Sequence, residues 1–284
     1  MKSKGLSNKK LLIILLLGIG LISYPTISNW WNSRVQTKLI DSYVEKAEKM
    51  SKEEMQAEFD KGYAYNDQLK KVEMPIINSD VVPGYEDTLK LSDQGMIGTI
   101  KIPKINLQLP VYHGTDEKTL SFAVGHIKGT SLPIGGKGSH AVLSAHRGLP
   151  SAQLFSNLDV LKEGDFFVIT VLNRTFTYKV DQIRIVEPQE ISDLTIDPDQ
   201  DYVTLLTCTP YGVNTHRLLV RGHRVEGNEE LVLTSEALEL DSTIIAPVVA
   251  FPLLVVFVIF IFVKGRKKKP EESGHSESET TESE

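Results

Sequence analysis

Two long runs of apolar residues enclose the rest of the chain. The first extends without a charged residue from Leu11 to Ser33, and the second extends from Ser242 to Val263. At 1.5 Å per helical residue, each run is long enough to cross a hydrocarbon layer about 30 Å thick. The pattern therefore predicts a transmembrane helix at 11–31 and another at 242–263.

The apolar positions after the first run follow a helical period. Between Val35 and Met50 they recur every three or four residues, with charged residues between them. Ser51 followed by Glu54 resembles a capping box, so a second helix is expected to begin there and to end near Leu69. The amphipathic pattern favours helices that pack on a folded domain over a solvated stalk.

From Gly95 onwards, short apolar segments alternate with turn-forming residues, whereas the link at 75–91 shows little regular pattern. The run RTFTYKV alternates polar and apolar side chains, which is typical of a half-buried strand. Many short strands of this kind indicate a β-barrel or a β-sandwich, so the fold class is mainly β. The predicted strands are Met96–Ile102, Leu107–Tyr112, Ala141–Ala145, Asp165–Leu172, Arg174–Val186, Tyr202–Thr207 and a strand from His216, with short helices at Glu117–Val124 and Ser151–Leu158.

Charge places the folded region outside the membrane. Basic residues precede the first apolar run and follow the second at 264–269, so the positive-inside rule puts both termini in the cytoplasm. A cleaved signal peptide is the rival interpretation of the first run. No small-x-small cleavage site follows that run, and Trp30 with Trp31 resembles an interfacial belt, which favours an uncleaved anchor. The net charge of −6, without a basic face in mid-chain, argues against a nucleic-acid partner.

These patterns divide the 284 residues into seven parts. They are a basic cytoplasmic leader (1–10), a transmembrane signal-anchor (11–31), an extracellular helical segment with a linker (32–94), a β domain (95–226), a second linker (227–241), a transmembrane helix (242–263) and a cytoplasmic tail (264–284) whose last part is acidic.

Cys208 is the only cysteine in the chain. It follows a short β-rich segment and precedes the turn formers Pro210 and Gly212, so it is expected at the end of a strand. Most lone cysteines are small buried hydrophobic residues. A thiol without a disulfide partner outside the cell is also a candidate nucleophile, because catalytic thiols lie in partly exposed, electropositive sites.

Two further residues are candidates for the same site. His146 ends the apolar segment AVLSAH, the same strand-end placement as Cys208, and would supply a base. Arg217 lies nine positions after Cys208, so an antiparallel return would bring its guanidinium beside the sulfur. His113, His126 and His140 lie among glycines and are expected to be surface or structural residues. One cysteine with scattered histidines lacks the ligand spacing of a zinc site, and no metal or cofactor is predicted.

Three motifs together resemble the sortases, the membrane-anchored cysteine transpeptidases of Gram-positive bacteria. They are TLLTC ending at Cys208, SAHRG around His146, and NTHRLLVRG containing Arg217. The segments IPKI, YHGT and GHIKGTSLP, together with two predicted membrane spans, are similar to the class C, pilin-polymerising branch.

The resemblance implies a fold, a reaction and partners. The fold would be an eight-stranded sortase-type β-barrel, with Cys208 as nucleophile, His146 as acid and base, and Arg217 as the group that binds the substrate or stabilises the oxyanion. Cys208 would attack the Thr carbonyl of an LPxTG-type sorting signal, and an amine would resolve the thioester. That amine would be a lysine of another pilin or, in a sortase that attaches surface proteins, a cell-wall precursor.

One departure from class C and two rival functions stay open. Class C enzymes often carry a lid with an Asp-Pro-aromatic motif, and no such motif occurs between Tyr65 and Gly95, so a lid would use other residues, with Met74–Asp80 as its expected location. A Cys-His hydrolase would form the same thioester and let water resolve it. A membrane-held binding barrel would instead bury Cys208 without using it.

Overall fold

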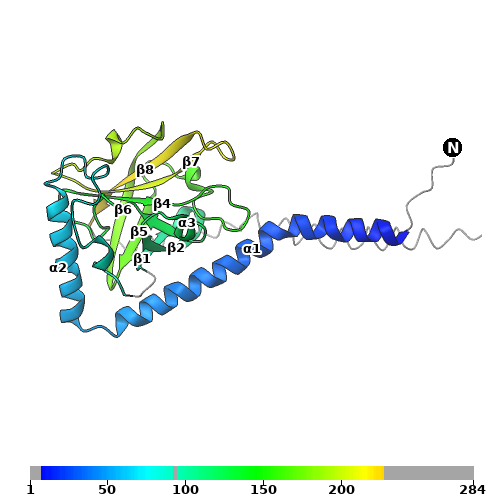
Figure 1. Ribbon diagram of the computed structural model, residues 1–284, viewed down its shortest axis with the longest axis horizontal. Coiled ribbons are helices and arrows are strands. Elements are labelled where there is room, and N and C mark those ends of the chain that lie inside the picture. The colour runs from blue at the N-terminus through cyan, green and yellow to red at the C-terminus, as the bar shows by residue number, and fades with distance from the viewer. Residues whose placement is uncertain (1–7, 92–94, 227–284) are drawn as a thin grey trace, which may run out of the picture. The chain divides into compact units, whose positions relative to one another are not determined.

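The computed structural model describes residues 8–91 and 95–226 (Figure 1). Short 3-10 helices connect the main elements at Tyr85–Asp87 (η1), Pro103–Ile105 (η2), Leu158–Val160 (η3) and Ser192–Leu194 (η4). The main elements are, in chain order, α1 (Asn8–Glu48), α2 (Lys52–Leu69), β1 (Met96–Ile102), β2 (Leu107–His113), α3 (Glu117–Leu120), β3 (Val124–His126), β4 (Ser139–Ser144), β5 (Phe166–Val171), β6 (Arg174–Val186), β7 (Asp201–Thr209) and β8 (His216–Val225).

The eight strands close into one barrel in the order β1-β2-β3-β4-β7-β8-β6-β5. The pairs β2–β3 and β4–β7 are parallel, and the other pairs are antiparallel. Closure leaves no strand of the barrel with an unpaired edge, which removes a site for unwanted pairing with other chains. The mainly β, eight-stranded barrel that the sequence predicted is confirmed.

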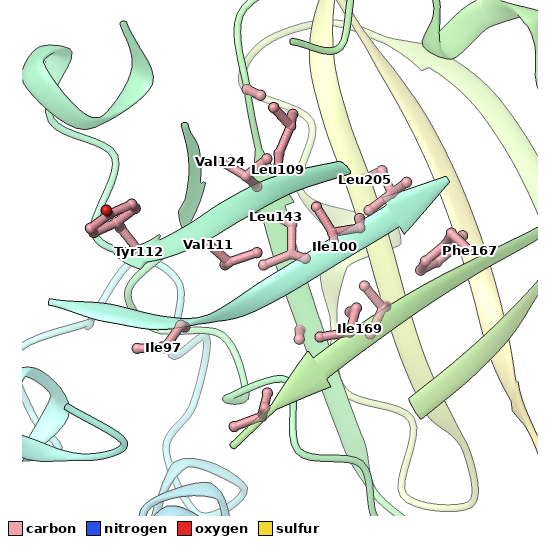
Figure 2. Packing of buried hydrophobic residues seen from close by; sticks show 14 of the residues in the cluster. Ile97, Ile100, Leu109, Val111, Tyr112, Val124, Leu143, Phe167, Ile169 and Leu205 are labelled. Atoms are coloured by element: carbon pink, nitrogen blue, oxygen red, sulfur yellow. The ribbon is translucent and has the colours of Figure 1, made fainter. Parts of the chain in front are cut away.

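The inward-facing side chains of the barrel form the core (Figure 2). Ile100, Leu109, Leu143, Phe167 and Leu205 are at most 1% exposed and point into the same interior. Burying one aliphatic or aromatic side chain contributes about 1.5–3 kcal/mol relative to leaving it in water. This packing makes the barrel a rigid frame for groups mounted at the ends of its strands.

The two N-terminal helices pack on the barrel, as their amphipathic pattern predicted. On α1, the Tyr43 hydroxyl donates to the carbonyl of Ile97 (2.8 Å) and accepts from the amide of Leu172 (2.9 Å). The helix α2 begins with the predicted capping box, in which the side chains of Ser51 and Glu54 each bind the other residue's backbone amide. The two Tyr43 contacts join α1 to strand β1 and to the turn between β5 and β6.

The membrane spans are described only in part. Within 8–91 and 95–226, one helix is long and apolar enough to cross a membrane: it covers Leu12–Glu48, and an 18-residue window within it has a mean hydropathy of 1.8. The predicted anchor at 11–31 and the extracellular helix after it form one continuous helix, α1. The predicted linker at 227–241, the second span at 242–263 and the tail lie outside the described residues.

Two short helices were predicted incorrectly. The helix expected at Glu117–Val124 ends at Leu120, because Val124 begins β3, a three-residue strand too short to show an alternating pattern. No α-helix forms at 151–158, since the backbone there bonds to other segments. The carbonyl of Ser151 accepts from Asn32 Nδ2 of α1 (2.7 Å), and the amide of Phe155 donates to the carbonyl of His146 (3.1 Å).

Candidate active site

Cys208 lies one residue before the end of β7 and is partly exposed. Side chains alternate along a strand, so Cys208 shares a face with Leu206 while Leu205 points into the core. The antiparallel register places Cys208 directly opposite Arg217 on β8. Opposed residues in such a ladder have Cβ atoms about 4.5–5.5 Å apart, so the thiol and the guanidinium stem lie side by side on the outer face of the barrel.

His146 reaches the same place from the neighbouring strand. The parallel register of β4 and β7 pairs Ser144 with Leu206. Two further residues along each chain lead to His146, just beyond the end of β4, and to Cys208. His146 and Cys208 therefore lie at adjacent strand ends.

The segment that carries His146 is fixed to β7 at its base. The amide of Ala145 donates to the carbonyl of Leu206 (3.2 Å), and the Thr207 hydroxyl donates to the carbonyl of Ala145 (2.8 Å). The carbonyl of His146 itself accepts from the amide of Phe155. A partly exposed imidazole on a held backbone is suited to repeated proton transfer.

Arg217 is bonded to the loop between β7 and β8. Its Nη1 donates to the carbonyls of Asn214 (3.3 Å) and His216 (3.1 Å). Arginine keeps its charge at any physiological pH, and its planar fork offers several donors for one acceptor group. The structure thus places the three predicted site residues at the same end of β4, β7 and β8.

Three other histidines of the barrel strands are buried. His113, His126 and His140 are at most 7% exposed, so the expectation that they are surface or structural residues holds only in its structural form. Burial lowers the pKa of His113 and of His140 to about 4 and that of His126 to about 3. These three imidazoles are therefore neutral at pH 7 and lie inside the fold.

An apolar strip on the outer face of the barrel is contacted by a segment that precedes the barrel. The strip consists of Val142 on β4 and Leu219 on β8, with Leu206 of β7 packed against them. Ile76 packs against the cluster that contains Val142 and Leu219. We call residues 74–80 the covering segment; its last residue, Asp80, pairs with Lys128 (2.5 Å).

A pocket of about 210 Å³ lies beside the covering segment. Its walls come from the end of α2, the loop after β3 and the loop between β6 and β7. Within the described part of the chain, no group of three or more His, Cys, Asp or Glu residues is placed to hold a metal ion.

Arg147 is a contact of the site that the sequence did not single out. Its side chain is 8% exposed, pairs with Asp159 through Nη2, and donates to the Thr209 hydroxyl through Nη1 (3.2 Å). The only sequence signal was position, because Arg147 follows His146 directly and Thr209 follows Cys208.

Comparison with known proteins gives one family. The family model described as Sortase domain matches residues 100–225, which contain Cys208, His146 and Arg217. A curated relative from Bacillus subtilis (strain 168), Sortase D, is 32% identical over 131 residues. That match covers 45% of this chain and 63% of the relative, so the chain spans less than two thirds of that protein's length.

Solved structures match over a longer stretch. Sortase C1 from Streptococcus agalactiae is 46% identical, with a TM-score of 0.62, and the match covers 67% of this chain and all of that chain (100%). Sortase C from Clostridium perfringens, solved with the C-terminal cell wall sorting motif, is 43% identical, with a TM-score of 0.60 over 67% of this chain and 100% of that chain.

Proposed function

This chain belongs to the sortase family of cysteine transpeptidases, and we propose that it is a class C enzyme that joins pilin subunits into polymers at the cell surface. The observation that carries the proposal is that Cys208 pairs with Arg217 across the β7–β8 ladder while His146 follows the adjoining end of β4. A thiol, a base and a fixed cation in that order suit acyl transfer through a covalent intermediate.

The first half of the proposed reaction forms a thioester. His146 takes the proton of Cys208, and the thiolate attacks the Thr carbonyl carbon of an LPxTG-type sorting signal. The bond from that carbon to the following Gly nitrogen breaks, and His146 returns the proton to the leaving amine. The acyl group then remains on the sulfur of Cys208.

The second half transfers the acyl group to an amine. A lysine of another pilin attacks the thioester carbon, gives its proton to His146 and releases the Cys208 thiolate. His146 then passes that proton to the thiolate. The product is an amide between two subunits, and the enzyme returns to its starting state without a metal or a redox cofactor.

Arg217 is proposed to bind the oxygen that becomes negative during both attacks. Its cross-strand pairing with Cys208 supports this role. The hydrogen bonds from Arg217 to the carbonyls of Asn214 and His216 hold its guanidinium near the start of β8. A charged donor already in place costs little reorganisation when the oxyanion forms.

The covering segment is proposed to occupy the place of the sorting signal until substrate arrives. Ile76 packs against the cluster that contains Val142 and Leu219, and apolar side chains of a bound peptide are proposed to use this cluster. The ion pair between Asp80 and Lys128 is solvent-exposed and contributes little, since exposed pairs are worth about 0–1 kcal/mol. The cover is therefore displaceable, and residues 74–80 would serve as the lid in place of an Asp-Pro-aromatic motif.

The proposed setting is the outer face of the cell membrane, with the anchor at 11–31, a second span at 242–263 and both termini in the cytoplasm. Lipid would contact both spans. The topology is tested with single cysteines in a Cys208→Ala background and an impermeant maleimide on protoplasts. Glu163→Cys, on the barrel, should be labelled in intact protoplasts, and His275→Cys only after lysis; labelling of His275→Cys before lysis contradicts this topology.

The acceptor distinguishes pilin polymerisation from its two rivals. An LPxTG-type peptide is offered to the enzyme together with a lysine-bearing pilin domain, a cell-wall precursor peptide, or water alone. Isopeptide product with the pilin lysine supports the proposal. Product only with the precursor indicates attachment of surface proteins, and release of free acid at an unchanged rate with either amine present indicates a hydrolase.

A further inference from the structure

Arg147 is a buried charge that the proposed mechanism does not use. Its side chain is 8% exposed although it lies in an open loop beside a partly exposed histidine. A guanidinium loses much hydration when it is buried, so it is retained inside a protein only where partners hold it. The partners of Arg147 therefore indicate what the charge is for.

Those partners belong to three different segments around the site. Nη2 pairs with the carboxylate of Asp159 on η3, and Nη1 donates to the hydroxyl of Thr209 at the end of β7. The centre of the guanidinium also lies 5.9 Å from the ring centre of Tyr211, in the loop between β7 and β8. Gly148 follows with φ of 79°, and a Cβ on it would come within 3.2 Å of the same ring.

The contact with Thr209 extends the link between β4 and β7 past the end of their ladder. The backbone bond from Ala145 to Leu206 is followed by the bond from the Thr207 hydroxyl to Ala145, and the bond from Arg147 to Thr209 comes next along both chains. Each partner in this last bond is the immediate neighbour of His146 or of Cys208. Thr209 faces away from Cys208 on β7, so Arg147 ties the two segments together without entering the space between imidazole and thiol.

We infer that Arg147 is a positioning residue that sets the separation of His146 from Cys208, with Asp159 holding the guanidinium and Thr209 receiving its second bond. This inference rests on the proposed roles of His146 and Cys208. A misplacement of about 1 Å between reacting groups costs about 10²-fold in rate. Loss of Arg147 should therefore lower the rate of acylation rather than the affinity for the peptide.

The experiment is a double-mutant cycle on acylation by an LPxTG-type peptide, with Arg147→Gln in the native background and in His146→Ala. If Arg147 acts through His146, Arg147→Gln lowers kcat about tenfold to a hundredfold with little change in KM in the first background and has no further effect in the second. The same fold-loss in both backgrounds, or a loss confined to KM, overturns the inference. Arg174→Gln is the matched control, because Arg174 also bonds a side-chain oxygen and lies over a ring, but does so beside α2.

Two further measurements separate the possible failures. Thr209→Val removes a single hydrogen bond and should reproduce part of the kcat loss even where Arg147→Gln folds poorly; native kcat in a folded Thr209→Val variant counts against the inference. Alkylation of Cys208 by iodoacetamide needs no peptide. A native enzyme that is alkylated but never acylated contradicts the proposed function, whereas normal acylation in Arg147→Gln contradicts only the positioning role.

Discussion

Cys208 and Arg217 are direct cross-strand partners in the ladder of β7 and β8, yet the Arg217 guanidinium bonds to the carbonyls of Asn214 and His216. The arginine is thus held beside the thiol by its own loop, with its fork directed by backbone acceptors. This arrangement suits a guanidinium that stabilises an oxyanion, because the negative charge exists only during the acyl-transfer step.

Arg217→Lys tests whether the fork or the charge matters. Lysine keeps the charge but lacks the planar pair of donors, so acylation should fall by roughly 10² to 10³, the scale for losing one oxyanion donor. Single-turnover acylation is measured beside the alkylation rate of Cys208. Slow acylation with unchanged alkylation supports the oxyanion role, while near-native acylation in both Arg217→Lys and Arg217→Ala removes Arg217 from the site.

Ile76→Ala tests the cover over the apolar strip. Ile76 packs against the cluster that contains Val142 and Leu219, whereas its neighbour Ile77 is 62% exposed, which makes Ile77→Ala a matched control. Truncating Ile76 weakens the contact that the peptide must replace, so acylation should become faster at low peptide concentration. Ile77→Ala should behave as native. Equal rates in all three proteins would show that residues 74–80 do not compete with the substrate.

The fold could be predicted from the sequence where a pattern was long. The thirteen-residue strand β6 was predicted with the bounds that the structure has, and the capping box at Ser51 located the start of α2. Short elements failed for physical reasons. The strand β3 has three residues, and in 151–158 several backbone groups bond to α1 and to His146, while the bonds within the segment are i→i−3 turns.

The candidate site residues were selected from local sequence patterns. Cys208 and His146 were selected because each follows a β-rich segment, and Arg217 because an antiparallel return would place it opposite Cys208. The roles of Ile76 and Arg147 depend on which distant segment each one touches, and no local pattern in a single sequence contains that information.

The buried histidines predict how stability depends on pH. Burial lowers the pKa of His140 to about 4, below the value of 6.5 expected in the unfolded chain, and the same holds for His113 and His126. Between the folded pKa of about 4 and the unfolded pKa of 6.5, the unfolded state binds more protons than the folded state. The free energy of unfolding should therefore fall as pH decreases from 6.5 toward 4. Urea unfolding across this range measures the slope, and His140→Gln should make it shallower; an unchanged slope would contradict the assignment.

The most direct test of the account is the mass of the intact protein after incubation with an LPxTG-type peptide. The account predicts an added mass equal to the peptide fragment that ends at Thr, less one water, attached to Cys208 and released by hydroxylamine as expected for a thioester. Cys208→Ala should gain no mass while unfolding at the same temperature as native protein. An adduct on Cys208→Ala, or a native protein that converts the peptide without passing through an adduct on Cys208, would contradict the claim that this thiol is the nucleophile.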